Sequence, residues 1–365
     1  MGLPPSRHGS HGAITVLVVD DSKVLRMLLL HLLESDPQIR VIGTVDDGQA
    51  ALDFVSKQKP DVVVMDIHMP GLDGFETTRR LMETYPVPIV ICSATSNPQE
   101  VATTFKMMEA GAVACIAKPT GPEHPQFEER VAMLLQTVKL MSEVKVVRRW
   151  PRPLAPTPPV PRPGGERPAR AEITVVGIGA STGGPPVLQT VLAGLPKDFP
   201  APILVVQHIA HGFLPGLAEW LGHTTGFQVH IASYGTQPLA GHVYLAPDDF
   251  QMGLSAGGRI VLTKEGPENG LRPAVSYLFR SLAEVCGLRS VGVLLTGMGK
   301  DGAAELKSMR DGGAITIAQD HGSSVVHGMP GEAIRLGGAS HVLPADKIAD
   351  GLVSIVRKNS AEREL

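Results

Sequence analysis

The chain has 365 residues, 43% hydrophobic and 19% charged, which is long enough for two domains that each bury a core. Its 33 basic and 36 acidic residues give a formal net charge of -3, and 4% of residues are aromatic, so we expect no nucleic-acid partner. The three cysteines lie far apart and form no CxxC pair, which argues against a disulfide framework or a zinc site. No apolar run resembles a signal peptide or a membrane span. We therefore expect a soluble cytoplasmic protein without direct membrane insertion.

The first part of the chain alternates short apolar runs with amphipathic segments. Residues 14–19, ITVLVV, predict a buried strand, and residues 23–35, KVLRMLLLHLLES, have helical spacing. Further strands are expected in RVIGTV, DVVVMD, PIVICSA and ACIA. Repeated alternation predicts a doubly wound α/β domain around a parallel sheet, in which active groups gather at the carboxyl ends of the strands.

Five polar side chains stand where these strands end: Asp20, Asp21, Asp66, Ser93 and Lys118. Carboxylates that converge in this way repel one another unless a divalent cation is present, and hard oxygen ligands suit Mg²⁺. A carboxylate beside such a metal can attack a phosphoryl group, whose oxygens Lys118 and Ser93 would meet. Each residue alone is an ordinary polar side chain at a strand end, but five in register favour a phosphoryl-transfer site.

The motifs VVDDS, VVVMDIHMPGLDG, ICSAT and AKP, within about residues 13–125, resemble the receiver domain of two-component response regulators. The resemblance implies that Asp66 is the phosphoacceptor, that a sensor histidine kinase is the phosphodonor, and that phosphorylation requires Mg²⁺. Its implied metal ligands are Asp21, Asp66 and the backbone carbonyl of His68. Its implied acid pair and switch residues are Asp20, Asp21, Ser93 and Lys118. Cys115 departs from the pattern, because receivers usually carry an aromatic switch residue at that position.

A proline-rich stretch, RRWPRPLAPTPPVPRPGGERPAR at residues 148–170, separates the two halves of the chain. Proline removes backbone donors and disfavours helix before it, so this stretch predicts an extended tether, with a PxxP ligand for a partner domain as the alternative. We expect a receiver domain over residues 13–130, a proline-rich linker over 142–171 and a catalytic domain over 172–358.

Strands and helices alternate again after the linker. Strands are expected in EITVVGIG, APILVVQHIA, HVYLAP, RIVLTK, SVGVLLTGMG and AITIAQ. Helices are expected in PPVLQTVLAGLP, GFLPGLAEWLGH, AVSYLFRSLAEVCG and AAELKSMRDGG. The second half therefore predicts another doubly wound α/β domain around a mostly parallel sheet.

The stretch TVVGIGASTGG at residues 174–184 suits either a phosphate-binding loop or a nucleophile. A dinucleotide site needs an acidic residue at the end of the second strand, but His208 stands there. Acyl chemistry fits better, with Ser181 as nucleophile, His208 as its base, and glycines that clear space for an incoming carbonyl. Asp301, just past a later strand, would orient the imidazole, although it also fits a helix N-cap before AAELKSM.

The motifs GASTGG, QHIAHGF, AGHVYLAP, LTGMGKDG, AITIAQ and HGMPGEAI, behind a receiver and a linker, resemble the chemotaxis protein-glutamate methylesterase family. This implies hydrolysis of glutamate γ-methyl esters, and deamidation of glutamines, on the cytoplasmic helices of methylated chemoreceptors, without a cofactor for hydrolysis. It also implies the Ser181–His208–Asp301 triad, Met298 as a backbone oxyanion donor, and Thr182 close to the histidine.

One stretch departs from this family's pattern. The sequence from Asn269 to Ala274 reads NGLRPA, where the family commonly has NRHRPS, so two polar or charged side chains are missing at Gly270 and Leu271. Two other functions remain open from sequence. The second half could bind a partner without hydrolysis, or it could bind a nucleotide.

Overall fold

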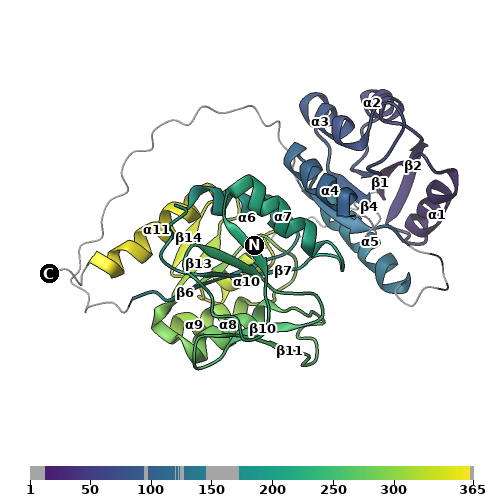
Figure 1. Ribbon diagram of the computed structural model, residues 1–365. Helices are drawn as coiled ribbons and strands as arrows, with labels where there is room; N and C mark the ends of the chain where they lie inside the picture. Colours follow the sequence, from purple (N-terminus) through teal and green to yellow (C-terminus); the bar gives the residue numbers. More distant parts are fainter. Residues whose placement is uncertain are drawn as a thin grey trace, which may run out of the picture. The chain divides into compact units, whose positions relative to one another are not determined.

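The computed structural model describes residues 13–93, 98–119, 121, 123, 127–144 and 172–361, which form two compact units (Figure 1). The predicted linker, 142–171, lies outside the described residues from position 145 onward. Among the described helices, none is long and apolar enough to cross a membrane.

The first unit has a five-stranded sheet in the order β2-β1-β3-β4-β5, and every strand pair is parallel. Helices α1 and α5 pack together, and α2 and α3 pack together. The strands are β1 (Ile14–Val19), β2 (Ile39–Val45), β3 (Val62–Met65), β4 (Ile89–Ser93) and β5 (Ala114–Ala117). The helices are α1 (Lys23–Glu34), α2 (Gly48–Lys57), α3 (Gly74–Thr84), α4 (Pro98–Ala110) and α5 (Phe127–Ser142). The predicted doubly wound parallel fold is therefore confirmed for this half.

Helix α5 extends past the boundary expected at residue 130. It buries Leu134, Val138 and Met141, and it contacts β3, β4 and β5. Cutting the chain at residue 130 would expose this apolar face, so we place the end of the first domain after Ser142.

The second unit has a seven-stranded sheet in the order β14-β13-β12-β6-β7-β9-β8, again with every pair parallel. Helices α6, α7 and α11 lie on one face and α8, α9 and α10 on the other (Figure 1). The strands are β6 (Val175–Ala180), β7 (Ile203–Gln207), β8 (Gln228–Ile231), β9 (His242–Leu245), β12 (Ser290–Leu294), β13 (Ile315–Gln319) and β14 (His341–Leu343). The helices are α6 (Gly184–Gly194), α7 (Leu214–Thr225), α8 (Val275–Val285), α9 (Ala303–Asp311), α10 (Met329–Arg335) and α11 (Ala345–Ala361).

The run RIVLTK does not join the parallel sheet. It forms β11 (Ile260–Thr263), which pairs antiparallel with β10 (Gln251–Leu254) in a separate hairpin. Strand β10 packs against α8, and Gly253 permits this because a Cβ there would lie 2.5 Å from Ser281 Oγ. The hairpin thus places the loop that follows it next to the start of α8.

Both sheets reverse their strand order at one point. In the first unit the chain leaves β1 for β2 on one side and returns to β3 on the other. In the second, β6 leads to β7 on one side, whereas β12 comes back on its other side. Ligands of doubly wound folds bind outside the carboxyl ends of strands at such switch points. The two candidate sites are therefore expected after β1 and β3, and after β6, β7 and β12.

Candidate functional site

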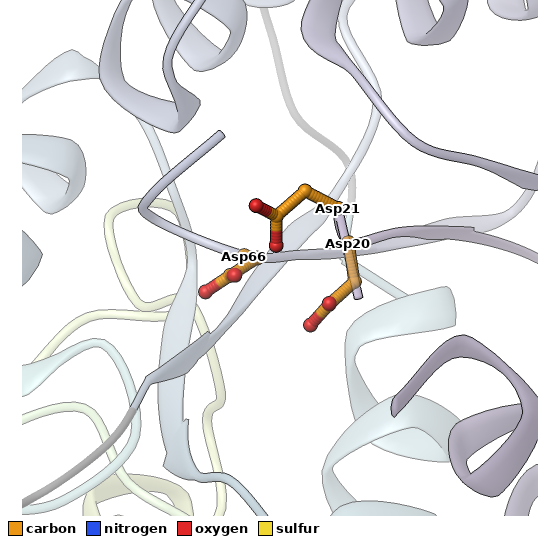
Figure 2. A group of neighbouring side chains, drawn as sticks. All are labelled: Asp20, Asp21 and Asp66. Atoms are coloured by element: carbon orange, nitrogen blue, oxygen red, sulfur yellow. The ribbon is translucent and has the colours of Figure 1, made fainter. Parts of the chain in front are cut away.

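Three carboxylates gather at the switch point of the first unit (Figure 2). Asp20 and Asp21 follow β1, Asp66 follows β3, and one oxygen from each lies within 4.8 Å of the others. Lys118, after β5, places Nζ 3.1 Å from Asp20 Oδ2 and 2.7 Å from Asp66 Oδ2. The five-residue pattern predicted from sequence thus brings at least these four side chains together.

This cluster of three carboxylates has the oxygen ligands that a hard divalent cation needs. Asp20 Oδ2 is buried and, despite the nearby ammonium, makes no hydrogen bond of acceptable angle with any described residue. Its other oxygen accepts the Ser22 amide at 2.9 Å, which fixes the carboxylate. A carboxylate held in this way, with free lone pairs beside Asp21 and Asp66, fits Mg²⁺.

The protonation of Asp66 reflects its crowded position. Burial raises the pKa of Asp66 above its usual value and the negative charge of Asp20 adds to this, while Lys118 and the Ile67 amide oppose it. The pKa of Lys118 is raised although burial works against it, because Asp66 and Asp20 stabilise the ammonium. The excess negative charge is therefore only partly compensated, and a cation would complete the balance.

The other predicted pocket residues lie at the same sheet edge or beside it. Ser93 is the buried last residue of β4, and His68 is exposed two residues after Asp66. Cys115 pairs with Ile91 across β4 and β5 and places Sγ 3.9 Å from the Ile116 carbonyl. The departure at the aromatic position therefore puts a small, half-buried thiol in β5.

The second site forms where β6, β7 and β12 end side by side. Ala180 pairs with Gln207, so Ser181 and His208 are the next residues on neighbouring strands. The His208 amide donates to the Ala180 carbonyl at 2.9 Å, and the Ser181 amide donates to the Thr296 carbonyl at 3.0 Å. Backbone pairing alone thus brings the predicted nucleophile beside the predicted base.

His208 and Asp301 lie in direct contact. His208 Nε2 is 3.1 Å from Asp301 Oδ2, and the two side chains are 10% and 2% exposed. The Nε2 atom makes no hydrogen bond of acceptable angle, so the pair is close but not aligned. Because Nε2 faces Asp301, Nδ1 is the nitrogen left for Ser181, whose hydroxyl is hydrogen-bonded to no described residue. Catalytic hydrogen bonds are often loose without substrate.

Asp301 accepts the first amides of a helix, but of a different helix from the one that the sequence suggested. Helix α9 begins after Gly302 without a side-chain cap. Asp301 instead accepts the first amides of α8, from Val275 to Oδ2 at 2.6 Å and from Ser276 to Oδ1 at 3.2 Å. The positive end of the α8 dipole therefore stabilises this carboxylate.

The charge of Asp301 is held by several donors. The Ser276 hydroxyl donates to Oδ1 at 2.6 Å, and the side-chain amide of Asn269 donates to the same atom at 3.1 Å. Burial alone would raise the pKa of Asp301, but the close contact with His208, together with the hydrogen bonds from Ser276 and Val275, lowers it to about 2. Asp301 is thus ionised at neutral pH and able to orient an imidazole.

A candidate oxyanion pocket adjoins Ser181. Gly297 approaches the nucleophile so closely that a Cβ on it would lie 2.7 Å from Ser181 Cβ. The next residue, Met298, and Thr182 after the nucleophile both have amides that donate to no described residue. Free amides on two turns that meet at Ser181 are the donors that a tetrahedral oxyanion requires.

The sequence suggested that the glycines of GIGASTGG leave open space for an ester. In the structure, the protein's own side chains fill that space. A Cβ on Gly179 would lie 2.3 Å from Val275, one on Gly183 would lie 2.5 Å from Val325, and one on Gly184 would lie 2.2 Å from Gln207. These glycines make room for the protein's own side chains. They bring α8 and the 325–327 segment against the nucleophile turn.

Several residues of this site were missed by sequence reasoning. Gln207 donates from Nε2 to the carbonyls of Ser181 at 2.9 Å and His208 at 2.8 Å, and its place directly before His208 was an available signal. Asn269 and Ser276 are brought to Asp301 by the folding of a distant loop. Asn269 begins the NGLRPA stretch that departs from the family pattern, but no local pattern in the sequence marks Ser276.

Comparisons with known proteins cover both units. The family model described as CheB methylesterase matches residues 176–352, and the response regulator receiver domain model matches residues 16–126. A protein-glutamate methylesterase/protein-glutamine glutaminase of Nitrosospira multiformis is 54% identical, over 94% of this chain and 97% of that protein. One of Methanospirillum hungatei is 44% identical, over 94% of this chain and 98% of that protein. The solved catalytic domain of Thermotoga maritima CheB methylesterase is 42% identical with a TM-score of 0.49, covering 50% of this chain and 98% of that one.

Proposed function

Because the chain belongs to the protein-glutamate methylesterase/protein-glutamine glutaminase family, we propose that Ser181, His208 and Asp301 hydrolyse γ-methyl esters of receptor glutamates. One observation carries this assignment. A buried, ionised Asp301 contacts His208, and strand pairing sets His208 beside Ser181 at the switch point of the sheet. This is the set of roles that a serine acyl-transfer centre needs, and chain order does not matter to it.

The reaction would proceed through an acyl-enzyme. His208 takes the proton of the Ser181 hydroxyl, whose Oγ forms a bond to the ester carbonyl carbon. The tetrahedral intermediate collapses as His208 returns the proton to the departing methoxy group, which leaves as methanol. Water then attacks the acyl-enzyme with His208 as base, releasing the glutamate and restoring the Ser181 hydroxyl.

The amides of Met298 and Thr182 would stabilise the oxyanion in both steps. Removing one such donor typically costs about 100- to 1,000-fold in turnover, so the turn that holds Met298 would make a substantial contribution beside that of the triad. Deamidation uses the same machinery, with a receptor glutamine as substrate and ammonia as the leaving group.

The receiver would control this activity through Asp66. Its carboxylate attacks the phosphorus of a phosphohistidine on a sensor kinase, and the histidine nitrogen leaves. Bound Mg²⁺, held by Asp21, Asp66 and the His68 carbonyl, would neutralise charge on the carboxylates and the phosphoryl oxygens. Lys118 and Ser93 would contact the phosphoryl oxygens. Phosphorylation of Asp66 would shift the chain from a restrained to an active state. Because the phosphodonor kinase would draw on ATP, the reaction would take place in the cytoplasm.

The test is methanol release from membranes that carry methylated chemoreceptors, measured with and without a small-molecule phosphodonor and Mg²⁺. Wild-type protein should release methanol and should be stimulated only when phosphodonor and Mg²⁺ are both present. Asp66→Asn should keep the basal rate and lose the stimulation. Ser181→Ala should lose release under all conditions. Release by Ser181→Ala at the wild-type rate would contradict the catalytic assignment, whatever the behaviour of Asp66→Asn.

A further inference from the structure

Thr296 lies between the nucleophile turn and the candidate oxyanion loop. It follows β12, is fully buried, and directly precedes Gly297 and Met298. Its hydroxyl accepts the Val326 amide at 2.9 Å. The same oxygen lies 3.0 Å from the Thr182 carbonyl and 3.2 Å from the Val326 carbonyl. A hydroxyl has one proton, so it donates to one carbonyl at a time, and Thr182 is the nearer.

The backbone of Thr296 connects the same segments. Its carbonyl accepts the Ser181 amide at 3.0 Å, and its amide donates to Gln319 Oε1 at 2.7 Å. The following Gly297 amide donates to the Val326 carbonyl at 2.9 Å. One residue thus makes hydrogen bonds to the nucleophile turn, to the end of β13 and to the 325–327 segment.

These contacts involve Thr182 and Met298, the two residues whose amides donate to no described residue. Thr182 is held through its carbonyl by Thr296, and Met298 follows Gly297, whose amide donates to the Val326 carbonyl. The distance between two oxyanion donors must be kept close to that set by the transition state. A buried hydroxyl that is bonded to both sides is suited to this, because removing it leaves a partly buried amide and a partly buried carbonyl without these partners.

We propose that Thr296 is a positioning residue that sets the Thr182 and Met298 amides relative to each other. It contacts no reacting atom and acts through those two backbone groups. The proposal rests on the proposed acyl-transfer function. A threonine that merely stabilised the core would affect folding without selectively affecting turnover, which makes the two roles separable.

Thr316 provides a matched control on the neighbouring strand β13. It is also fully buried, donates its hydroxyl to the Gly338 carbonyl at 2.7 Å, and accepts the Ser340 amide at 2.9 Å. Its partners belong to the loop before β14 and to none of the segments around Ser181. Thr296→Val and Thr316→Val therefore remove the same kind of hydroxyl from equally buried places.

The experiment measures kcat and KM for methanol release by the phosphorylated full-length protein, together with the thermal midpoint. Thr296→Val should lower kcat by about 10- to 100-fold, because a misplacement of about 1 Å costs about 100-fold, and should change KM less than about threefold. Thr296→Ser, which keeps the hydroxyl, should retain kcat within about threefold. Thr316→Val should lower the thermal midpoint without lowering kcat.

Equal losses of kcat in the two valine variants, or an unchanged kcat in Thr296→Val, would overturn the proposal. Should Thr296→Val fail to fold, Thr296→Cys decides, because a thiol of similar size is a weak donor and acceptor. A kcat for Thr296→Cys well below that of Thr296→Ser supports the role, and equal values refute it. Ser181→Ala is included in each series. Methanol release by that variant would contradict the catalytic assignment itself, and the two failures are thus distinguishable.

Discussion

At the scale of single residues, Asp301 makes a prediction about stability at acid pH. Its pKa in the folded protein is lowered to about 2, from its ordinary value of 3.8. The stabilisation is therefore present above pH 4 and is lost as the pH falls from about 4 to about 2. A shift of this size corresponds to about 2 kcal/mol. Asp301→Asn, which does not titrate, should lack this loss.

The measurement is urea unfolding of both proteins between pH 2 and pH 6. Fluorescence of Trp220, in the second unit, would be followed in a Trp150→Phe background, since these are the two tryptophans of the chain. We expect the wild type to lose about 2 kcal/mol more than Asp301→Asn across this interval. Parallel pH curves for the two proteins would mean that Asp301 is not held as an ionised cap of α8.

The sequence predicts site residues that lie at or just after strand ends. It does not predict residues that a loop brings next to them in the fold. Ser181 and His208 could be proposed because each directly follows an apolar run that forms a strand, and Asp301 because it stands in the turn after β12. Ser276 could not, because its contact with Asp301 depends on where α8 begins relative to β12. Local spacing predicts for the same reason that Asp301 caps α9, whereas it accepts the first amides of α8. Local spacing identifies the next helix in the chain and not the one that packs alongside.

At the scale of elements, the turn from β6 into α6 depends on Gly183. This residue has φ +74 and would place a Cβ 2.5 Å from Val325 Cβ. Gly235 has nearly the same φ, +77, but nothing lies within 4 Å of its Cβ position. Gly235→Ala should cost about 1–2 kcal/mol of stability for the left-handed backbone alone. Gly183→Ala should cost a further 1–3 kcal/mol or so for overpacking, and it should also lower kcat because the turn carries Ser181.

Thermal unfolding and methanol release of the two variants check this comparison. A Gly183→Ala protein as stable and as active as Gly235→Ala would show that the packing of Val325 on the turn is unimportant. The elements themselves were mostly predictable, because buried parallel strands are continuous apolar runs. Strand β8 was missed because its sequence, QVHI, is largely exposed at the sheet edge. The run RIVLTK, which forms β11, was assigned to the main sheet because an apolar run does not reveal its pairing partner, and its partner β10 was not predicted.

At the scale of the whole molecule, the length of the tether should set the basal activity. If the unphosphorylated receiver restrains the catalytic unit of its own chain, the restraint depends on the effective concentration that the linker imposes. This concentration falls roughly as the −3/2 power of linker length, so doubling residues 145–171 should lower it about threefold. Basal methanol release should then rise by up to about threefold. Activity at full phosphorylation should not change, because the restraint is already relieved there.

The matched control keeps the length of 145–171 and scrambles the order of its residues. A tether acts through its reach, so the scrambled protein should behave as the wild type does. A PxxP ligand depends on the order of its residues, so scrambling would change regulation if a partner domain bound that motif. If basal methanol release changed when the linker was scrambled but not when it was doubled, the linker would act as a binding motif and not as a tether. If only doubling changed basal methanol release, the restraint would be intramolecular. Linker length would then determine how strongly the state of Asp66 controls ester hydrolysis at Ser181.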